Sequence, residues 1–300
     1  MLKYNETKGQ VARITTSVRS RRTAWMLFAM TVAFVVAPLH ALIPPQYSDN
    51  DNYRAKGDIK SIVVKMFDAV DKIDHIEVGA MQEHPVIVEY SESGNQSRVV
   101  ELNQKGDILF YFTAEEKDGQ PSTQKRYSNK EWMEAYSTMD YNKGKLQSET
   151  VYNADGELSY TEVYTYNKAG QLLNVTRRNA RGEKVQTVEY AYDEAGHCTL
   201  ERMKSKDDRF VYQRNMSYDA QGRLSGEEYQ SQEGILKSKT VYTYNAQGDI
   251  DHVRQGVPGG AVSTTKITYE YDARNNWIRC VLYASDYIPT TIIARQIEYR

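Results

Sequence analysis

The feature that most constrains this chain is a five-residue turn motif, Tyr-[Asn/Asp]-x-x-Gly, repeated at a spacing of 26 residues in the C-terminal half. Copies begin at Tyr166, Tyr192, Tyr218 and Tyr244, and a degenerate copy begins at Tyr271. A period of this length is typical of repeat architectures, in which each unit buries its apolar face only by stacking on its neighbours. The motif therefore predicts an array of one small structural unit.

A second series of turns lies between these motifs, so each repeat contains two turns and two strands. The first series holds Gly144, Gly170, Gly196, Gly222 and Gly248, and the second holds Gly156, Gly182, Asp208, Gly234, Gly260 and Asp286. Asn and Asp side chains bond to the backbone ahead of them, and glycine takes the positive φ that closes a type I turn with a bulge. The spacing predicts antiparallel β-hairpins in series.

Side-chain alternation assigns the two faces of these strands. In one repeat Tyr164 and Tyr166 share a face, and Thr165 between them lies on the opposite, small and polar face. The turns from Gly144 to Asp286 imply about thirteen strands, more than the roughly ten that an open twisted sheet carries without curling. We expect an all-β fold, an antiparallel β-hairpin repeat forming a long curled sheet or a partial spiral or barrel, with the tyrosine face inward.

The first 41 residues differ from the rest of the chain. They hold six Lys and Arg against one Glu, followed by an apolar run, Trp25–Ala37, that is shorter than the roughly 20 residues needed to cross a bilayer. A basic segment, an apolar run and a small residue at Ala41 together predict a signal peptide over 1–41. Cleavage after Ala41 is the first choice and cleavage after Ala37 the second, and a retained N-terminal anchor is the alternative.

The remainder divides into a linker and a continuous array. Residues 42–58, with Pro, Asn and Asp and no period, are interpreted as an exposed linker. The region 59–139 is expected to hold the first strands and weak repeats, and it runs on into the regular repeats of 140–300. The pattern is lost between Thr113 and Met139, where 131–136 is interpreted as a short helical turn or a long loop.

Charge and cysteine content exclude two further properties. After removal of 1–41 the chain has 32 Lys and Arg against 39 Asp and Glu, a net charge of about −7 without a basic cluster, so it is a poor partner for nucleic acid. Cys198 and Cys280 lie about six strands apart at roughly 4.8 Å per strand. That separation exceeds disulfide reach unless the sheet closes on itself, and we expect two free, buried thiols.

Motifs for catalysis, cofactors and metals are absent from the sequence. It contains no Gly-x-Ser-x-Gly, no Gly-Lys-[Ser/Thr] loop and no His-Glu-x-x-His, and we predict no catalytic residue, cofactor or metal ligand. Tyrosines at the period of the repeat are interpreted as core. Those that break the period, Tyr212, Tyr229, Tyr283 and Tyr287, are the candidates for an exposed binding surface.

The longer element Tyr-x-Tyr-[Asn/Asp]-x-x-Gly-x-[Leu/Ile], present at Tyr164–Leu172 and Tyr242–Ile250, resembles the unit of the YD-repeat family found in rearrangement-hotspot (Rhs) and wall-associated bacterial proteins. The last segment, 271–300, is similar to the closing unit of small secreted YD-repeat proteins of the Bacteroides kind. The resemblance covers about 160 residues. It implies a β-hairpin repeat fold and, by analogy with some members, carbohydrate binding or cell contact; the toxin-carrying members are far longer.

We therefore expect an exported protein, periplasmic, on the outer surface or extracellular, with a non-enzymatic binding or structural role in the cell envelope. The expected partner is a glycan or an envelope or surface protein, and after signal cleavage the chain is not an integral membrane protein. The alternatives are a carbohydrate-active enzyme with two carboxylates inside the curled sheet and a toxin-associated or immunity-type protein. A cleft with carboxyl groups about 5 to 10 Å apart would favour the enzyme, and an interior filled by tyrosine would oppose it.

Overall fold

The computed structural model describes residues 55–82, 84–129 and 132–300. The predicted signal peptide, and the linker as far as residue 54, lie outside them. The described residues form one antiparallel sheet of nineteen strands. The strands are β1 (Ile59–Asp71), β2 (Ile76–Met81), β3 (Val86–Tyr90), β4 (Gln96–Leu102), β5 (Ile108–Lys117), β6 (Gln120–Ser128), β7 (Met133–Asn142), β8 (Lys145–Asn153), β9 (Leu158–Tyr166), β10 (Leu172–Asn179), β11 (Lys184–Tyr192), β12 (Cys198–Ser205), β13 (Phe210–Tyr218), β14 (Leu224–Ser231), β15 (Leu236–Tyr244), β16 (Ile250–Gly256), β17 (Val262–Tyr271), β18 (Trp277–Ala284) and β19 (Ile288–Tyr299).

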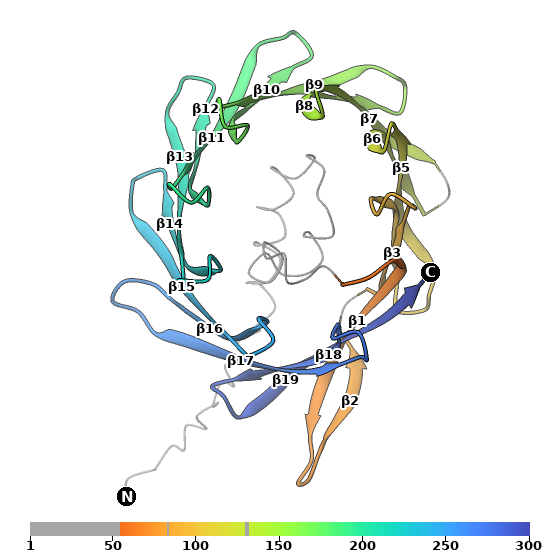
Figure 1. Cartoon of the computed structure of the whole chain (residues 1–300), viewed down its shortest axis with the longest axis vertical. Coiled ribbons are helices and arrows are strands. Elements are labelled where there is room, and N and C mark those ends of the chain that lie inside the picture. The colour runs from red at the N-terminus through yellow and green to blue at the C-terminus, as the bar shows by residue number, and fades with distance from the viewer. Residues whose placement is uncertain (1–54, 83, 130–131) are drawn as a thin grey trace, which may run out of the picture.

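The sheet closes on itself into a barrel. Each strand from β3 to β19 pairs with its neighbour in sequence, and β1 pairs with β19 on one side and with β3 on the other. Ile62 of β1 lies opposite both Ile297 and Val88, and the ribbon forms a continuous ring (Figure 1). The expected all-β hairpin repeat is confirmed, and its curling proceeds to full closure because β1 bridges the first and last hairpins.

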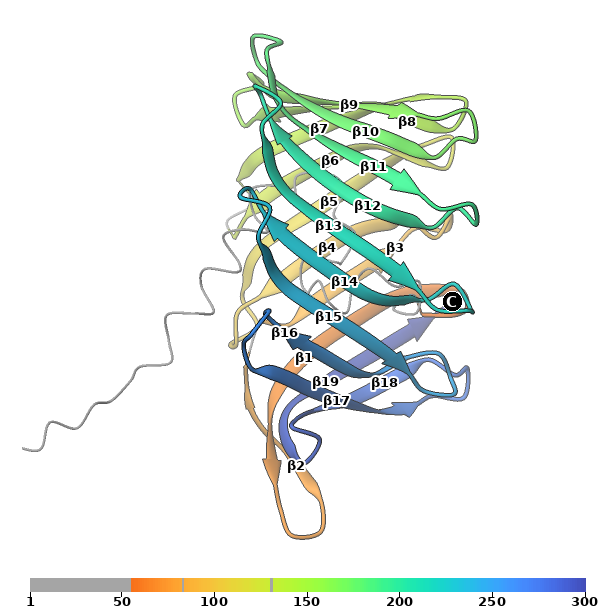
Figure 2. The same cartoon turned by 90° about the vertical axis from the view of Figure 1, so that its left-hand side faces the viewer.

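β2 is the one strand of the described residues that lies outside this ring. It pairs with the far end of β1, from Phe67 to Asp71, and the resulting hairpin projects beyond the barrel (Figure 2). Its side chains Ile73 and Val78 are exposed.

The turns have the predicted chemistry. At Asn167, the N–H of Gly170 donates to the Asn167 carbonyl and the N–H of Asn167 to the Gln171 carbonyl, which is a type I turn followed by a bulge. Where the series lacks glycine, Asp208 and Asp286 adopt positive φ of 60° and 68°. The assignment of Gly260 to this series was wrong: Gly259 carries the positive φ, because Val257-Pro258-Gly259-Gly260 forms a turn with Pro second and Gly third.

The motif tyrosines explain why neighbouring repeats stack in register. The hydroxyls of Tyr166, Tyr192, Tyr218 and Tyr244 each donate to a carbonyl 20 residues earlier, at Leu146, Leu172, Cys198 and Leu224. The last repeat is one residue longer, and there Tyr269 bonds to the Ile250 carbonyl instead. Phenylalanine would supply the ring without this bond, so the hydroxyl accounts for the choice of tyrosine.

Two other expectations are tested here. The helical turn or loop at 131–136 was wrong over its described part, because Met133–Tyr136 begins β7, which pairs with β6 and β8. Cys198 and Cys280 are both free thiols, as expected, although Cys198 is only half-buried.

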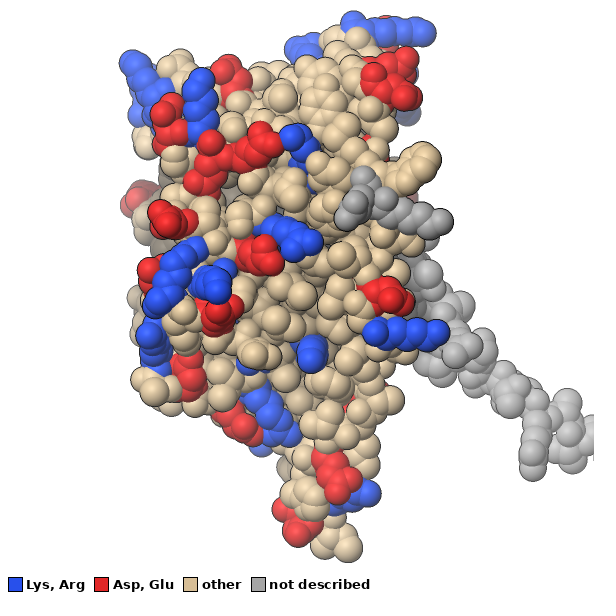
Figure 3. All heavy atoms as spheres, turned by 90° about the vertical axis from the view of Figure 1, so that its right-hand side faces the viewer, with Lys and Arg blue, Asp and Glu red and all other residues tan. Residues whose placement is uncertain are grey.

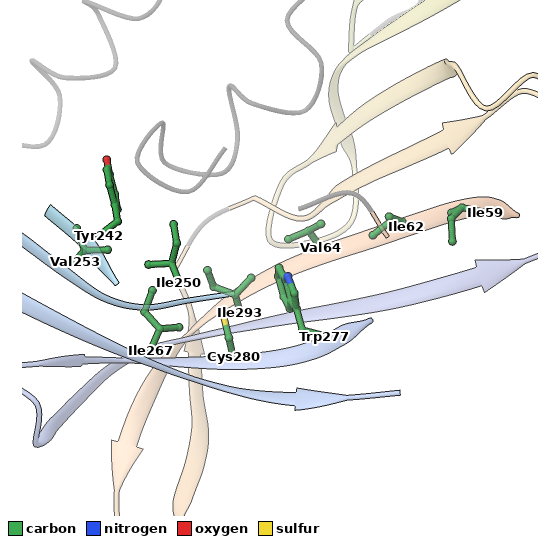
Figure 4. Packing of buried hydrophobic residues seen from close by; sticks show 10 residues of the cluster. All are labelled: Ile59, Ile62, Val64, Tyr242, Ile250, Val253, Ile267, Trp277, Cys280 and Ile293. Carbon is green, nitrogen blue, oxygen red and sulfur yellow. The ribbon is translucent and has the colours of Figure 1, made fainter. Parts of the chain in front are cut away.

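Burial separates the inner and outer faces. A cluster from β1 and β15–β19 packs on the inner face, where Tyr242, Ile267 and Trp277 are less than 5% exposed (Figure 4). The outer face carries exposed Thr165, Ala191 and other small residues, and basic and acidic side chains are interspersed over it (Figure 3). Among the described residues, none lies in a helix that could cross a membrane.

Candidate binding site on the inner wall

Charged side chains lie on the inner wall at positions that other repeats fill with valine. Glu149, Glu201 and Glu227 are separated by multiples of the 26-residue repeat, and the same phase holds the buried Val175 and Val253. Cross-strand pairs point to one face of a sheet, so these carboxyl groups share the face of the buried apolar residues. We call the two ion-pair networks below and the recess beside Glu149 the inner-wall site.

The first network joins β9 and β10. Glu162 is 2% exposed and lies directly opposite Arg177, whose Nη2 is 2.7 Å from Glu162 Oε1. The hydroxyl of Tyr164 donates to Glu162 Oε2 at 3.2 Å, and the Arg177 guanidinium lies 4.3 Å from the centre of the Tyr160 ring. The Glu162 carboxylate is therefore paired and held in place.

The second network joins β12, β13 and β14. Arg214 lies between two carboxylates, with Nη2 3.3 Å from Glu201 and Nη1 3.2 Å from Glu227. Tyr212 donates to Glu201 at 2.7 Å and Tyr242 donates to Glu227 at 2.8 Å. One guanidinium therefore contacts both carboxylates.

Glu149 occupies a recess and forms no ion pair with any other residue that the structure describes. It lies directly opposite Glu162 and is 1% exposed, and its Oε2 has no hydrogen-bond partner among the described residues. A cavity of about 30 Å³ lies beside it, lined by nine residues of β5–β8 that include Phe112, Gln124 and Ser137. This is room for one group the size of a water molecule.

Burial sets the ionisation of these groups. Desolvation is the main cause that raises the pKa of Glu149 to about 7; a hydrogen bond with Ser137 and the charge of Arg177 act against the rise, and the charge of Glu162 adds to it. Burial likewise raises the pKa of Tyr164 and of Tyr212. Near neutral pH the wall therefore carries a carboxyl group that gains or loses its proton readily, opposite Glu162 and its partner Arg177.

The four predicted binding tyrosines do not form one surface. Tyr212 was expected to be exposed, and this is wrong: it is 9% exposed and its ring stacks on Tyr229 at 5.7 Å, because β13 turns it to the inner wall. Tyr283 is half-buried on β18 beneath the Lys266 ammonium, and Tyr287 is 84% exposed in the β18–β19 turn. Tyr212 and Tyr229 thus belong with the inner-wall site, and a binding role for any of the four stays a prediction.

The charged members of the site were missed from the sequence, although a signal for them was present. Once the repeat is in register, Glu162 and Arg214 fall in the phase of the buried Val188. A charge at an apolar phase of a repeat costs stability, and this departure marks a special position. The spacing of the tyrosines alone does not reveal these charges, because Glu162 and Arg214 lie at another position of the repeat.

The His197 Nδ1 atom lies 3.0 Å from Asp193 Oδ2, and the imidazole ring stacks on Tyr218. Within 55–82, 84–129 and 132–300, no group of three or more His, Cys, Asp or Glu side chains could hold a metal ion.

No protein-family model matches this chain, and no curated protein does. Among solved structures it is similar to a porin-like protein from Bacteroides uniformis ATCC 8492, with 12% identity and a TM-score of 0.43 over 80% of this chain and 98% of that one. A porin-like protein from Bacteroides vulgatus ATCC 8482 has 11% identity and a TM-score of 0.31 over 79% of this chain and 97% of that one. A Photorhabdus luminescens Tc holotoxin pore has 10% identity and a TM-score of 0.23 over 76% of this chain and 18% of that one. At these values the matches carry no argument about function.

Proposed function

We propose that this chain is an exported protein of the YD-repeat type that binds a polar ligand, a glycan, at the inner-wall site and has no catalytic role. The observation that carries the proposal is the presence of the partly buried Glu201, Arg214 and Glu227, with side chains 17–26% exposed, at positions where the repeat tolerates buried valine. Replacing a buried ion network by packed apolar side chains is often neutral or stabilising. The fold therefore has no need of these charges, and recognition is the role left for them.

The chemistry of the wall suits a sugar. Tyrosine rings offer flat apolar faces for sugar rings, and carboxylate and guanidinium groups bond to hydroxyls. Tyr212 and Tyr229 stand beside Arg214 on adjacent strands. Barrels of 16–18 strands are too wide for their side chains to fill the interior, so they leave a channel. The same is expected of this eighteen-stranded barrel.

Export and an envelope location rest on the sequence. The segment 1–41 has the composition of a signal peptide, and the outer face of the barrel carries ion pairs such as Lys239–Glu228, which keep that face hydrated. A place in the periplasm, on the cell surface or outside the cell is compatible with both.

The enzyme alternative has one observation in its favour. Glu149 and Glu162 lie opposite each other, and burial raises the pKa of Glu149 to about 7, as in the proton donor of an acid–base pair. Against it, the recess at Glu149 holds about 30 Å³, whereas small-molecule sites hold roughly 300–1,000 Å³. Glu162 is also held by a hydrogen bond from Tyr164 and by its ion pair with Arg177. We therefore favour binding over hydrolysis.

The test is a glycan array followed by calorimetry with the mature chain. The network variant Glu201→Gln/Arg214→Met/Glu227→Gln should lose at least tenfold in affinity for the sugar that binds. The matched control, Lys239→Met/Glu228→Gln, removes an outward ion pair and should bind as the parent does. Equal binding by both variants would contradict the assignment to the inner wall, and release of reducing ends from the glycan that stops on Glu149→Gln would establish the enzyme instead.

A further inference from the structure

Among the described residues, the recess beside Glu149 has no cation in an ion pair with Glu149. Glu149 and Glu162 face each other, and Arg177 is the cation that pairs with Glu162. Arg126, also in the lining of the recess, is paired with Glu134 at 2.9 Å and lies over Phe110 and Phe112. When Glu149 ionises, one negative charge is therefore left without a dedicated partner.

The geometry also specifies the missing group. Glu149 Oε2 is buried and has no donor, and the Gln124 amide and the Ser137 hydroxyl line the same cavity of about 30 Å³. A group that fills it must be the size of a water molecule, donate several hydrogen bonds and carry positive charge. Water meets the first two conditions and leaves the charge unbalanced.

We propose that the recess formed by Glu149, Ser137 and Gln124 binds the protonated primary amine of a ligand, so that the glycan taken by the inner wall is one with a free amino group. An ammonium donates three hydrogen bonds, to the carboxylate of Glu149, the hydroxyl oxygen of Ser137 and the amide oxygen of Gln124. A guanidinium or a quaternary ammonium is too large for the cavity. This proposal rests on the proposed function for the identity of the ligand, and the amine site itself stands apart from it.

Other charged groups near Glu149 set the conditions. Glu162 and Arg177 act on it from β9 and β10, Tyr160 and Tyr164 from β9, Tyr141 from β7, and Lys125 and Arg126 line the recess from β6. An amine and a proton compete for the same carboxylate. Amine affinity should therefore rise with pH until Glu149 is fully ionised, above about pH 7.

The first arm of the test follows the Glu149 carboxyl carbon by NMR in protein with ¹³C-labelled glutamate, using Glu149→Gln for assignment. Methylammonium at ten times its dissociation constant should lower the Glu149 pKa by about one unit, by linkage. Sodium and tetramethylammonium at the same ionic strength should have no such effect. Ser137→Ala should weaken methylammonium binding, and the exposed Glu92→Gln should leave it unchanged. Equal responses to all three cations would overturn the amine site.

The second arm separates this proposal from the proposed function. Deacetylated chitin oligosaccharides should bind at least tenfold more tightly than acetylated ones, and Glu149→Gln should abolish the difference. Glycan binding that ignores acetylation and Glu149 would overturn the amine site and leave glycan binding intact. Methylammonium binding without binding of any glycan would support the amine site and overturn the glycan.

Discussion

Glu149 is a residue whose ionisation should reduce the stability of the fold. Its pKa in the folded state is about 7 against 4.5 in the unfolded chain, so the folded state favours the protonated form. The stabilisation of the folded state by the protonated Glu149 carboxyl is fully present below about pH 4.5 and is lost as the pH rises through 7. At 1.36 kcal/mol per unit, the loss is about 3 kcal/mol.

We predict that Glu149→Gln is more stable than the parent by up to about 3 kcal/mol at pH 8 and equal to it at pH 4. Urea unfolding at both pH values measures this. Glu92→Gln, in an exposed turn, is the control and should follow the parent throughout. A Glu149→Gln variant that is less stable than the parent at pH 8 would show that the buried carboxylate is compensated.

A second residue-scale prediction concerns Arg214. Arg214→Met removes the guanidinium that pairs with the partly buried Glu201 and Glu227 and should destabilise the fold by about 1–3 kcal/mol. The combined variant Glu201→Val/Arg214→Val/Glu227→Val, with Tyr212→Phe and Tyr242→Phe to remove the two hydroxyls bonded to these carboxylates, should recover this loss. Thermal unfolding compares the two, and a combined variant as unstable as Arg214→Met would mean that the charges hold the fold together.

What the sequence could predict at this scale was limited by side-chain direction. Tyr212 breaks the period, and that alone suggested exposure; the alternation along β13, in which Tyr212, Arg214 and Met216 share one face, would have placed it inside. The pairing of Glu149 with Glu162 depends on the register between β8 and β9, which a spacing in sequence does not fix.

At the scale of the element, the turn glycines differ in how much they matter. Gly222 has φ +77° and a Cβ there would lie 2.8 Å from Nε2 of His197, whereas Gly234 has φ +70° and open space around it. We predict that Gly234→Ala costs about 1 kcal/mol, the strain of a left-handed residue. Gly222→Ala should cost about 2 kcal/mol, because His197 must also leave the Tyr218 ring.

Chemical unfolding of the two variants measures the difference, and the double variant Gly222→Ala/His197→Ala supplies the control. When His197→Ala is the reference, Gly222→Ala should cost only as much stability as Gly234→Ala does if displacement of the His197 ring is the cause. Identical costs for Gly222→Ala and Gly234→Ala would show that backbone strain accounts for the whole effect.

Hairpins were the elements most open to prediction, because turn residues act locally. Asn167 and Gly170 determine their turn through bonds within five residues. The strand at Met133–Asn142 was missed because its pairs with β6 and β8 are made without the glycine motif at its start. Tertiary pairing overrides a weak local signal there.

The whole molecule differs from the expected open curled sheet by the strand pairing between β1 and β19. Closure depends on nine Cα partners between β1 and β19, from Ile59–Tyr299 to Asp68–Thr291, which join segments more than 220 residues apart. Hydrophobic alternation in both strands is compatible with closure and with an exposed edge. Periodicity therefore predicted the curvature, and the ring itself required the three-dimensional register.

Closure predicts a specific pattern of amide hydrogen exchange. In a closed ring β1 and β19 each have neighbours on both sides, so their amides should exchange as slowly as those of β11–β15. β2 is the internal control. The Lys72 N–H donates to the His75 carbonyl, and by the alternation of an antiparallel pair the N–H groups of Ile76 and Val78 point away from β1. These two amides should exchange at least a hundredfold faster than those of β1.

Rapid exchange along Ile62–Met66 and Ile293–Ile297, with β11–β15 still protected, would mean that the ring opens in solution at the β1–β19 seam. The inner wall would then be reached through a gap in the barrel, and ligand binding would have to be coupled to its closing.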